Sequence, residues 1–328
     1  MSRPIETLLM SAEGRRHRIP GMKLWVGVTD KDWYEYLALQ RPDEVNFWQP
    51  SGARTFKVLQ PGEPFLFKLH SPDNFIVGGG FFVRYSALPA SLAWDAFARK
   101  NGVESFEDLL KRVRKYRRAD DALDPIIGCN VLAEPFFLPR SLWIPVPAGW
   151  APNIVQGRGY ESHGDGAALW QAVVEATRLG DRVESPTMLP EEDGPRFGAE
   201  FLTRARLGQG AFRVLVTDAY QRRCAVTGEK TLPVLEAAHI KPYACEGPHR
   251  VQNGLLLRSD LHKLFDLGYV TVTPEFDMEV SSKLREDWSN GREYYAWHGK
   301  KLTHLPVEQF LQPARDFLRW HNEHRFKS

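Results

Sequence analysis

Two histidines and an asparagine lie at regular distances in the last third of the chain. His239 lies near the end of the apolar stretch 232–240, Asn253 comes 14 residues later, and His262 follows after 9 more residues. Hydrolysis of a phosphodiester needs a base that deprotonates water, a group that holds this base, and a cation beside the scissile phosphate. An imidazole, a carboxamide and a second imidazole can supply these functions, so we expect a phosphodiester-hydrolysing site here.

Two apolar segments must position the first histidine and the asparagine. The stretch 232–240 has the composition of a strand that carries the His239 imidazole out of a packed surface. A turn-rich polar loop follows, and Asn253 then precedes the apolar run Leu255–Leu257. We therefore expect two strands joined by a loop, with the Asn253 amide bracing the loop that holds the base.

A helix is expected to position the second histidine. Ser259 or Asp260 offers an N-cap for a helix over 261–267. His262 and Asp266 are four residues apart on this helix and therefore share one face. The segment predicts a strand, a loop, a strand and a helix in that order.

This order of elements, with these residues in it, resembles the ββα-metal unit of the HNH endonuclease family. The resemblance implies that His239 is the general base, that Asn253 orients the site and that His262 binds the metal. It also makes Asp266 a further metal ligand, or a group that supports the ligands. The implied activity is metal-dependent hydrolysis of nucleic-acid phosphodiesters.

The chain departs from the family pattern directly before the base. Many members have an acidic or imidazole ligand there, whereas this chain has Ala238. Glu236 lies on the same side of the strand as Ala238 by alternation, and we expect it to supply the missing oxygen. A histidine with one or two carboxylate oxygens and open water positions suits Mg²⁺ or Mn²⁺, with Zn²⁺ as the alternative.

The three cysteines of the chain, Cys129, Cys224 and Cys245, form no Cys-x-x-Cys pair. A structural zinc held by four thiolates, which the family often carries, is therefore excluded within one chain. We expect Cys224 to be a small buried side chain, and we expect no disulfide framework. With no run of about 20 apolar residues and no signal peptide, the protein is predicted to be soluble and cytoplasmic, without membrane contact.

A length of 328 residues with 43% hydrophobic content predicts two cores in an α+β protein. Composition changes near residue 150, and the acidic, proline-interrupted segment 181–198 resembles a linker. We therefore divide the chain into a first domain at 1–150, a helix and linker at 151–198, and a nuclease domain at 199–328.

The net charge of +2 does not by itself predict nucleic-acid binding, so local clusters matter more. One basic cluster lies at 111–118, with a solvated helix face as the alternative interpretation. A second leads into the expected nuclease unit and includes Arg213, Arg222 and Arg223. Both clusters could neutralise DNA phosphates.

The first domain has short apolar runs separated by glycine and proline turns. We expect strands at 23–28, 55–59, 64–69 and 75–85. We expect helices between or after them at 30–39, 92–101 and 106–118. This pattern predicts a small β-barrel edged by helices. The run Gly78–Gly80 is interpreted as a bulge or close-packed backbone rather than a phosphate nest.

A tryptophan-containing first strand, the aromatic segment 46–52 and a glycine-rich strand resemble the PUA superfamily, especially its EVE-like branch. The resemblance implies nucleic-acid binding, in several cases with recognition of a modified base turned out of the duplex. A pocket of aromatic faces can replace the lost base stacking. The candidates are Trp25, Phe47, Trp48 and Ser51, although the aromatic residues among them could instead fill the core.

The two resemblances together imply a modification-dependent restriction endonuclease that acts on DNA with modified cytosine or another altered base. One HNH unit cuts one strand, so double-strand cleavage suggests a homodimer. Two alternatives remain: an HNH nuclease or nickase that acts on unmodified DNA or RNA, and a reader that binds modified DNA without cutting it. A C-terminal helix is expected over 307–321, with Trp320 in the core.

Overall fold

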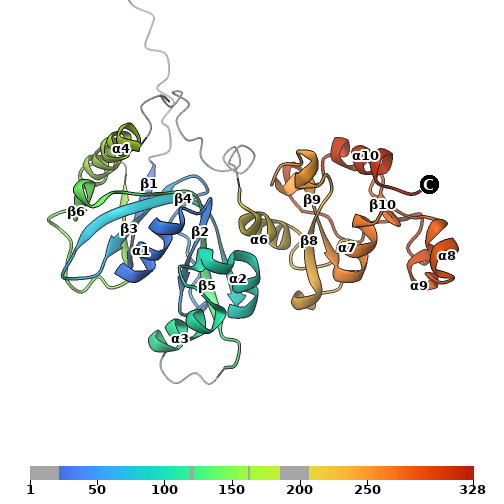
Figure 1. Cartoon of the computed structure of the whole chain (residues 1–328), viewed down its shortest axis with the longest axis horizontal. Coiled ribbons are helices and arrows are strands. Elements are labelled where there is room, and N and C mark those ends of the chain that lie inside the picture. Colours follow the sequence, from blue (N-terminus) through green and yellow to red (C-terminus); the bar gives the residue numbers. More distant parts are fainter. Residues whose placement is uncertain (1–21, 118–121, 162, 185–206) are drawn as a thin grey trace, which may run out of the picture.

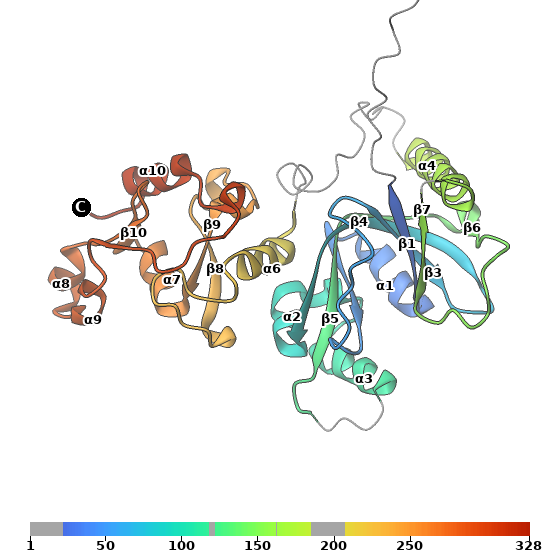
Figure 2. The ribbon, with the colours of Figure 1, turned by 180° about the vertical axis from the view of Figure 1, so that it is seen from behind.

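The N-terminal part of the protein is built on one mixed sheet. A computed structural model describes residues 22–117, 122–161, 163–184 and 207–328, and Figures 1 and 2 show it from opposite sides. The seven strands are β1 (Lys23–Thr29), β2 (Glu44–Gln49), β3 (Pro64–Leu69), β4 (Phe75–Pro89), β5 (Ile126–Phe137), β6 (Ile144–Pro145) and β7 (Gly157–Glu161). Their order is β2-β5-β4-β3-β1-β7, and β6 pairs with β4. Only β1 and β3 are parallel neighbours.

The predicted closed barrel is wrong, although the mixed α+β class and the sheet-rich character are confirmed. The sheet runs from β2 to β7, and these two strands do not pair within the described residues. β1 pairs with β3 on one side and with β7 on the other, so neither edge of β1 remains for closure onto β2. The predicted strand at 55–59 is also wrong: this segment is irregular, and its neighbour β3 already has a partner on each side.

All three predicted N-terminal helices are present, and a fourth follows. They are α1 (Lys31–Gln40), α2 (Ala90–Phe97, extended by the 3-10 turn Ala98–Asn101), α3 (Phe106–Tyr116) and α4 (Asp165–Glu184). Alternate residues of β3 face opposite sides of the sheet. Phe65 and Phe67 pack with Trp33 of α1, whereas Leu66 packs with Leu169 of α4. Helices α1 and α4 therefore cover opposite faces, and β3 is buried on both.

The glycine run in β4 allows the backbones of three strands to approach closely. A side chain at Gly78 would place its Cβ 2.3 Å from the carbonyl oxygen of Phe136, and one at Gly79 would come 2.7 Å from that of Phe65. The pairing of β4 with β5 shifts register between Gly79 and Phe81, at the end of this run, and again between Phe82 and Arg84. The run is thus a bulged, close-packed backbone, as the sequence indicates.

The N-terminal sheet includes elements beyond residue 150, where the first domain was expected to end. Strand β7 pairs with β1 along its length, and Val173 of α4 is buried with Leu24 and Val26. Strand β7 and helix α4 therefore pack with the first domain. The remainder of the predicted linker, 185–198, lies outside the described residues.

The C-terminal part contains a hairpin, a small sheet and several helices. Its elements are α6 (Gln209–Ala219), β8 (Leu235–His239), β9 (Gly254–Arg258), α7 (Ser259–Asp266), β10 (Val270–Val272), β11 (Asp277–Val280), α8 (Lys283–Trp288), α9 (Arg292–Tyr295), β12 (Lys300–Lys301) and α10 (Arg315–His324). Short 3-10 turns in this part lie at Leu232–Val234, Tyr243–Cys245, Val251–Asn253 and Gln309–Leu311. One further turn, Arg140–Leu142, lies between β5 and β6 of the N-terminal part. Among the described residues, no helix is both long and apolar enough to cross a membrane.

Two predictions about helix ends and the C-terminal tail are wrong. The N-cap of α7 is Arg258, whose guanidinium holds both oxygens of Asp260 at 2.7 Å, so Asp260 does not cap the helix. Helix α10 begins only at Arg315, and its buried residues are Leu318 and His321. Trp320 lies on a partly exposed side and stacks on the His324 ring with a centroid distance of 5.0 Å.

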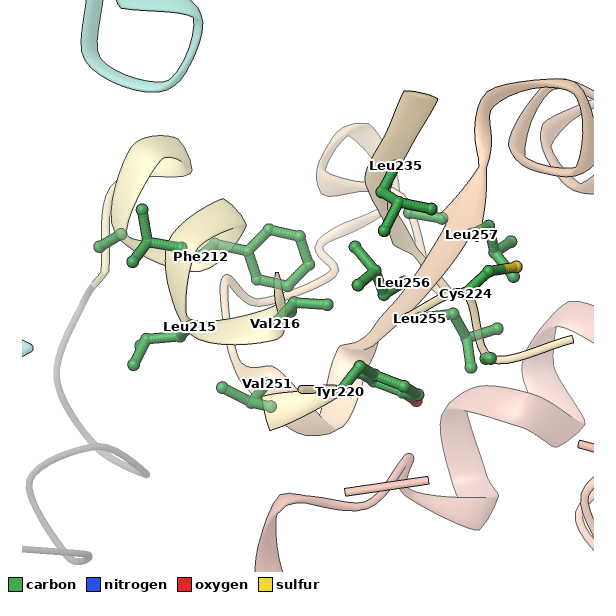
Figure 3. Packing of buried hydrophobic residues seen from close by; sticks show 14 of the residues in the cluster. Phe212, Leu215, Val216, Tyr220, Cys224, Leu235, Val251, Leu255, Leu256 and Leu257 are labelled. Atoms are coloured by element: carbon green, nitrogen blue, oxygen red, sulfur yellow. The ribbon is translucent and has the colours of Figure 1, made fainter. Parts of the chain in front are cut away.

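Helix α6 joins the two parts through a shared apolar core. It lies between them in both views of the chain. Phe212 and Val216 of α6 point toward the hairpin strands, as Figure 3 shows, and the same core includes Leu215 of α6 and Phe97 of α2. Cys224 is fully buried in this core, as expected. The C-terminal hairpin is thus held against the N-terminal sheet through one continuous packed layer.

Candidate active site

The β8–β9 hairpin sets the position of the predicted base. Strands β8 and β9 are antiparallel, with Ala238 opposite Leu255 and His239 opposite Gly254. Residues 255–257 are buried and anchor the hairpin in the core shown in Figure 3. His239 is therefore the last residue of a strand whose partner is anchored in the core by three buried leucines.

Asn253 braces the loop between these strands. The side chain is fully buried, and its Oδ1 accepts a hydrogen bond from the Lys241 amide at 2.8 Å. Its Nδ2 donates to the carbonyl oxygens of Lys241 at 2.9 Å and Pro248 at 3.0 Å. The carboxamide thereby ties both ends of the loop together two residues after His239. This geometry agrees with the bracing interaction expected from the sequence.

The His239 ring is held between aromatic neighbours. It stacks on Phe212 of α6 with a centroid distance of 3.9 Å and an interplanar angle of 14°. Its Nε2 lies 2.9 Å from Nδ1 of His249. Burial, with smaller contributions from His249 and His262, lowers the pKa of His239 to about 4. The imidazole is therefore neutral near pH 7 and can accept a proton.

The three predicted metal ligands lie side by side next to this ring. His262 Nδ1 is 2.6 Å from Glu236 Oε2, and His262 Nε2 is 3.4 Å from Asp266 Oδ2. Both carboxylates are about half exposed, whereas His262 is mostly covered. Strand β8 supplies Glu236 and helix α7 supplies the other two, one turn apart.

The donor chemistry of these residues fits a hard divalent cation that keeps open positions. Each nitrogen of His262 faces one carboxylate, so the three side chains do not surround a single point. In the part of the chain that the structure describes, no three His, Cys, Asp or Glu side chains enclose an ion position. Mg²⁺ commonly needs only one or two carboxylates and completes its shell with water and substrate phosphate. Glu236, His262 and Asp266 suit such a partial shell.

The proposed base and ligands share one open cleft of about 550 Å³. Glu236, His239, His262 and Asp266 line it from the hairpin and α7. Lys100 and Arg213 line it from the N-terminal part and from α6. The cleft therefore brings a proton acceptor, carboxylate oxygens and two cationic side chains together, a combination suited to a phosphodiester. Asn253 does not line the cleft, because its buried side chain lies behind the cleft wall and holds the loop.

A second pocket, of about 330 Å³, lies on the N-terminal sheet. Phe47 and Trp48 line it, as predicted, together with Trp33. Trp48 Nε1 donates to the Asn101 carbonyl oxygen at 3.0 Å, which fixes the indole. Trp25 does not line the pocket and instead meets Phe56 edge to face. Of the three aromatic candidates, Phe47 and Trp48 therefore line the pocket and Trp25 lies outside it.

The polar residues of this pocket were not identified from the sequence. The Asp30 carboxylate accepts a hydrogen bond from the Tyr116 hydroxyl at 2.7 Å and lies 3.6 Å from His70 Nε2. Burial and this bond to Asp30 raise the pKa of Tyr116 to about 12, so the phenol stays protonated. Arg112 also lines the pocket. Ser51, which was predicted here, lies outside the lining, and its Oγ accepts the Ala53 amide.

The comparison with family models decides the nature of the C-terminal site. Residues 224–273 match the family described as HNH endonuclease. This segment is an HNH endonuclease domain. The match covers β8, the 3-10 turn Val251–Asn253, β9 and α7, which together contain all the predicted catalytic and ligand residues. The family resemblance seen in the sequence is therefore confirmed.

Solved structures similar to the chain share little sequence with it. The Y47F mutant of ZmASCH from Zymomonas mobilis has 8% identity and a TM-score of 0.33, covering 46% of this chain and 97% of that chain. The modification-dependent TagI restriction endonuclease has 13% identity and a TM-score of 0.25, and the match covers 86% of this chain and 75% of that chain. The type IV phosphorothioation-dependent restriction endonuclease ScoMcrA has 12% identity and a TM-score of 0.21, and the match covers 92% of this chain and 53% of that chain. The comparison with curated proteins gives no match.

The arginines proposed to contact DNA have different environments. Arg213 lines the cleft of the HNH domain. Arg222 instead reaches the N-terminal sheet, where its Nη2 donates to Ser86 Oγ and the Ala87 carbonyl oxygen, both at 3.0 Å. Arg223 lies 3.4 Å from the His304 ring. As placed, Arg222 therefore serves the contact between the two parts, and only Arg213 faces the cleft.

Two contributors to the HNH site were missed in the sequence. His249 lies in a polar loop that has neither strand nor helix periodicity, so the hydrophobic pattern does not indicate that its side chain contacts His239. Phe212 belongs to a helix that precedes the hairpin, and its side chain stacks on His239 because α6 packs against the hairpin strands. A histidine four residues before Asn253 is the one signal that could have directed attention to His249.

Proposed function

We propose that this protein is a metal-dependent endonuclease that hydrolyses DNA phosphodiester bonds in the cleft of its HNH domain. The observation that carries the proposal is that Glu236, His239, His262 and Asp266 line one open cleft. Lys100 and Arg213 line the same cleft and add positive charge to its wall. The arrangement combines the base, the cation ligands and the phosphate contacts that this hydrolysis requires.

His239 is the general base of the proposed reaction. Its neutral imidazole takes a proton from water as the water oxygen bonds to phosphorus and the bond to the leaving oxygen breaks. Phe212 holds the ring in plane, and Asn253 fixes the loop that follows it. Positioning of this kind lowers the barrier because the base no longer has to be oriented during the reaction.

Glu236, His262 and Asp266 would hold Mg²⁺ or Mn²⁺, with Zn²⁺ as the alternative. A bound cation would stabilise the charge that develops on the phosphate and on the leaving oxygen. The half-exposed carboxylates leave room for water and for substrate oxygens. The three cysteines of the chain cannot supply the four thiolates of a structural zinc site, and the buried Cys224 Sγ accepts a hydrogen bond from the Arg258 amide at 3.3 Å.

The N-terminal pocket is the proposed reader of a modified base, with modified cytosine as the first candidate. Phe47 and Trp48 offer faces that can replace the stacking lost by a base turned out of the duplex. The Asp30 carboxylate can accept a hydrogen bond from an exocyclic amino group, and Tyr116 fixes its orientation. The protein would then act as a modification-dependent restriction enzyme in defence against phage. Two copies would cut both strands, so we propose a homodimer.

The proposal is tested with matched DNAs that carry plain, methylated, hydroxymethylated or glucosylated cytosine, each with Mg²⁺ and with Mn²⁺. We expect cleavage of at least one modified DNA and little cleavage of the plain one. Base stacking contributes about 1–3 kcal/mol, so Trp48→Ala should weaken binding of the preferred DNA by about 5- to 150-fold. Trp25→Ala is the matched control, because Trp25 lies outside the pocket.

Three outcomes would direct the proposal elsewhere. Equal cleavage of all four DNAs, or cleavage of RNA, would leave a nuclease without a modified-base reader. Cleavage of one strand only would identify a nickase. Selective binding without cleavage under either metal would reduce the protein to a reader, and would contradict the catalytic part of the proposal.

A further inference from the structure

His239 and His249 form a hydrogen-bonded pair of imidazoles at the mouth of the β8–β9 hairpin. Nε2 of His239 is 2.9 Å from Nδ1 of His249, and the two rings meet nearly edge to face with a centroid distance of 4.9 Å. Only one of the two nitrogens can carry the shared hydrogen. Among the described residues, no hydrogen bond occupies the other nitrogen of His239, Nδ1.

The direction of this hydrogen bond decides whether His239 can act as a base. If His249 Nδ1 donates, neutral His239 carries its own proton on Nδ1 and its only lone pair is already used. If His239 Nε2 donates, the Nδ1 lone pair of His239 is free to accept a proton from water. Only the second arrangement agrees with the proposed reaction.

We propose that His249 is a positioning residue that selects the Nε2–H tautomer of His239. The inference rests on the proposed function, in which His239 is the base. His249 Nδ1 accepts the hydrogen bond and therefore carries its own proton on Nε2. When His239 takes a proton from water onto Nδ1, the imidazolium keeps its Nε2–H bond to His249, which disperses the new positive charge.

The surroundings of His249 hold its ring in place. Tyr243 stacks on it with a centroid distance of 4.6 Å and an interplanar angle of 12°. Burial lowers the pKa of His249, while the negative charges of Glu44 and Asp43 act in the opposite direction and Lys100 acts with burial. These three charged groups belong to the N-terminal part of the chain. The acceptor of the hydrogen bond is therefore neutral near pH 7 and lies at the junction between the two parts.

Long-range ¹H–¹⁵N spectra of histidine-labelled, full-length protein test the assignment without any cleavage assay. We expect the His239 ring to give the pattern of a neutral imidazole with hydrogen on Nε2 and a free Nδ1. In His249→Ala, the ring should lose this preference and show a mixture of both tautomers. A wild-type ring with hydrogen on Nδ1 would overturn the proposal, even if the protein proves to be a nuclease.

Kinetics of three variants provide the second test. His249→Ala should lower kcat by about 100-fold with little change in KM, because general-base catalysis contributes about 10²–10⁴-fold. His249→Asn offers an oxygen close to the position of Nδ1 and should recover activity to within about 5-fold of wild type. His304→Asn is the control, since His304 is a half-buried histidine of the C-terminal part that does not line the cleft.

The outcomes separate this inference from the proposed function. Wild-type kcat in His249→Ala, or equal losses in the alanine and asparagine variants, would contradict a positioning role for His249. Full activity of His239→Ala would instead contradict the base assignment on which the inference rests. An effect on KM alone would place His249 in substrate binding and would also overturn the proposal.

Discussion

Neutralising Glu44 should loosen the contact between the N-terminal sheet and helix α6. The Glu44 side chain is fully buried, and its carboxylate accepts hydrogen bonds from the Gly210 amide at 2.8 Å and the Ala211 amide at 2.7 Å. Both amides belong to the first turn of α6, where an anion is favoured by the helix dipole. Lys100 Nζ contacts the same carboxylate at 2.8 Å.

The cost of Glu44→Gln follows from these contacts. The amide nitrogen of glutamine would face one of the two backbone donors, and an unpaired buried N–H costs about 1–3 kcal/mol. Loss of the anion at the helix N-terminus adds about 0.5–1 kcal/mol. Weakening of the remaining charge-assisted bonds brings the expected loss in the free energy of unfolding to about 3 kcal/mol.

Asp43→Asn provides a matched control for this substitution. Asp43 also contacts Lys100, at 2.6 Å, but its side chain is 63% exposed. An exposed ion pair contributes at most about 1 kcal/mol, so Asp43→Asn should be nearly neutral. Urea unfolding measures both losses, and hydrogen exchange at the Gly210 and Ala211 amides reports the local effect. A loss below about 1 kcal/mol in Glu44→Gln, or equal losses in both variants, would refute the reasoning.

Further predictions concern acid stability, the cation and the bulged strand. Burial lowers the pKa of His321 to about 4, so the neutral ring contributes its full stabilisation above pH 6.5. As the pH falls toward 4, about 3 kcal/mol of the free energy of unfolding is lost. Urea unfolding at pH 7 and at pH 4.5 should show a much smaller difference in this free energy for His321→Gln than for the wild type. Asp266→Asn should raise the Mg²⁺ concentration for half-maximal cleavage by about 10-fold or more, whereas Asp260→Asn on the same helix should not; equal effects would remove Asp266 from the metal site. Gly79→Ala should destabilise the protein by more than about 1 kcal/mol in thermal unfolding, because its Cβ would lie 2.7 Å from the Phe65 carbonyl oxygen; an unchanged Tm would contradict the close packing.

The catalytic unit was predictable because its information is local. His239, Asn253 and His262 lie within one hairpin and the helix that follows, so spacing and apolar runs fix their order and their elements. The positions of Glu236 and Asp266 beside His262 also follow from short distances along the chain. Strand alternation places Glu236 toward α7, and the four-residue step places Asp266 beside His262.

Features that depend on distant partners were not predictable in the same way. The segment 55–59 has the composition of a strand but no free strand edge to pair with, whereas β7 pairs with β1 more than 120 residues earlier. Glu44 appears in the sequence as an ordinary acidic residue, and its function depends on a helix 166 residues later. Such roles arise only when the two parts of the chain pack together.

The DNA-cleavage activity of the His239→Ala variant tests most directly the central claim that His239 is the general base. The variant and the wild type are compared on the preferred DNA with Mg²⁺ or Mn²⁺, and DNA binding is measured separately without added metal. We predict that cleavage falls by at least about 100-fold while DNA affinity changes by less than about 2-fold, because His239 acts on water rather than on DNA. Wild-type cleavage by His239→Ala would contradict the account.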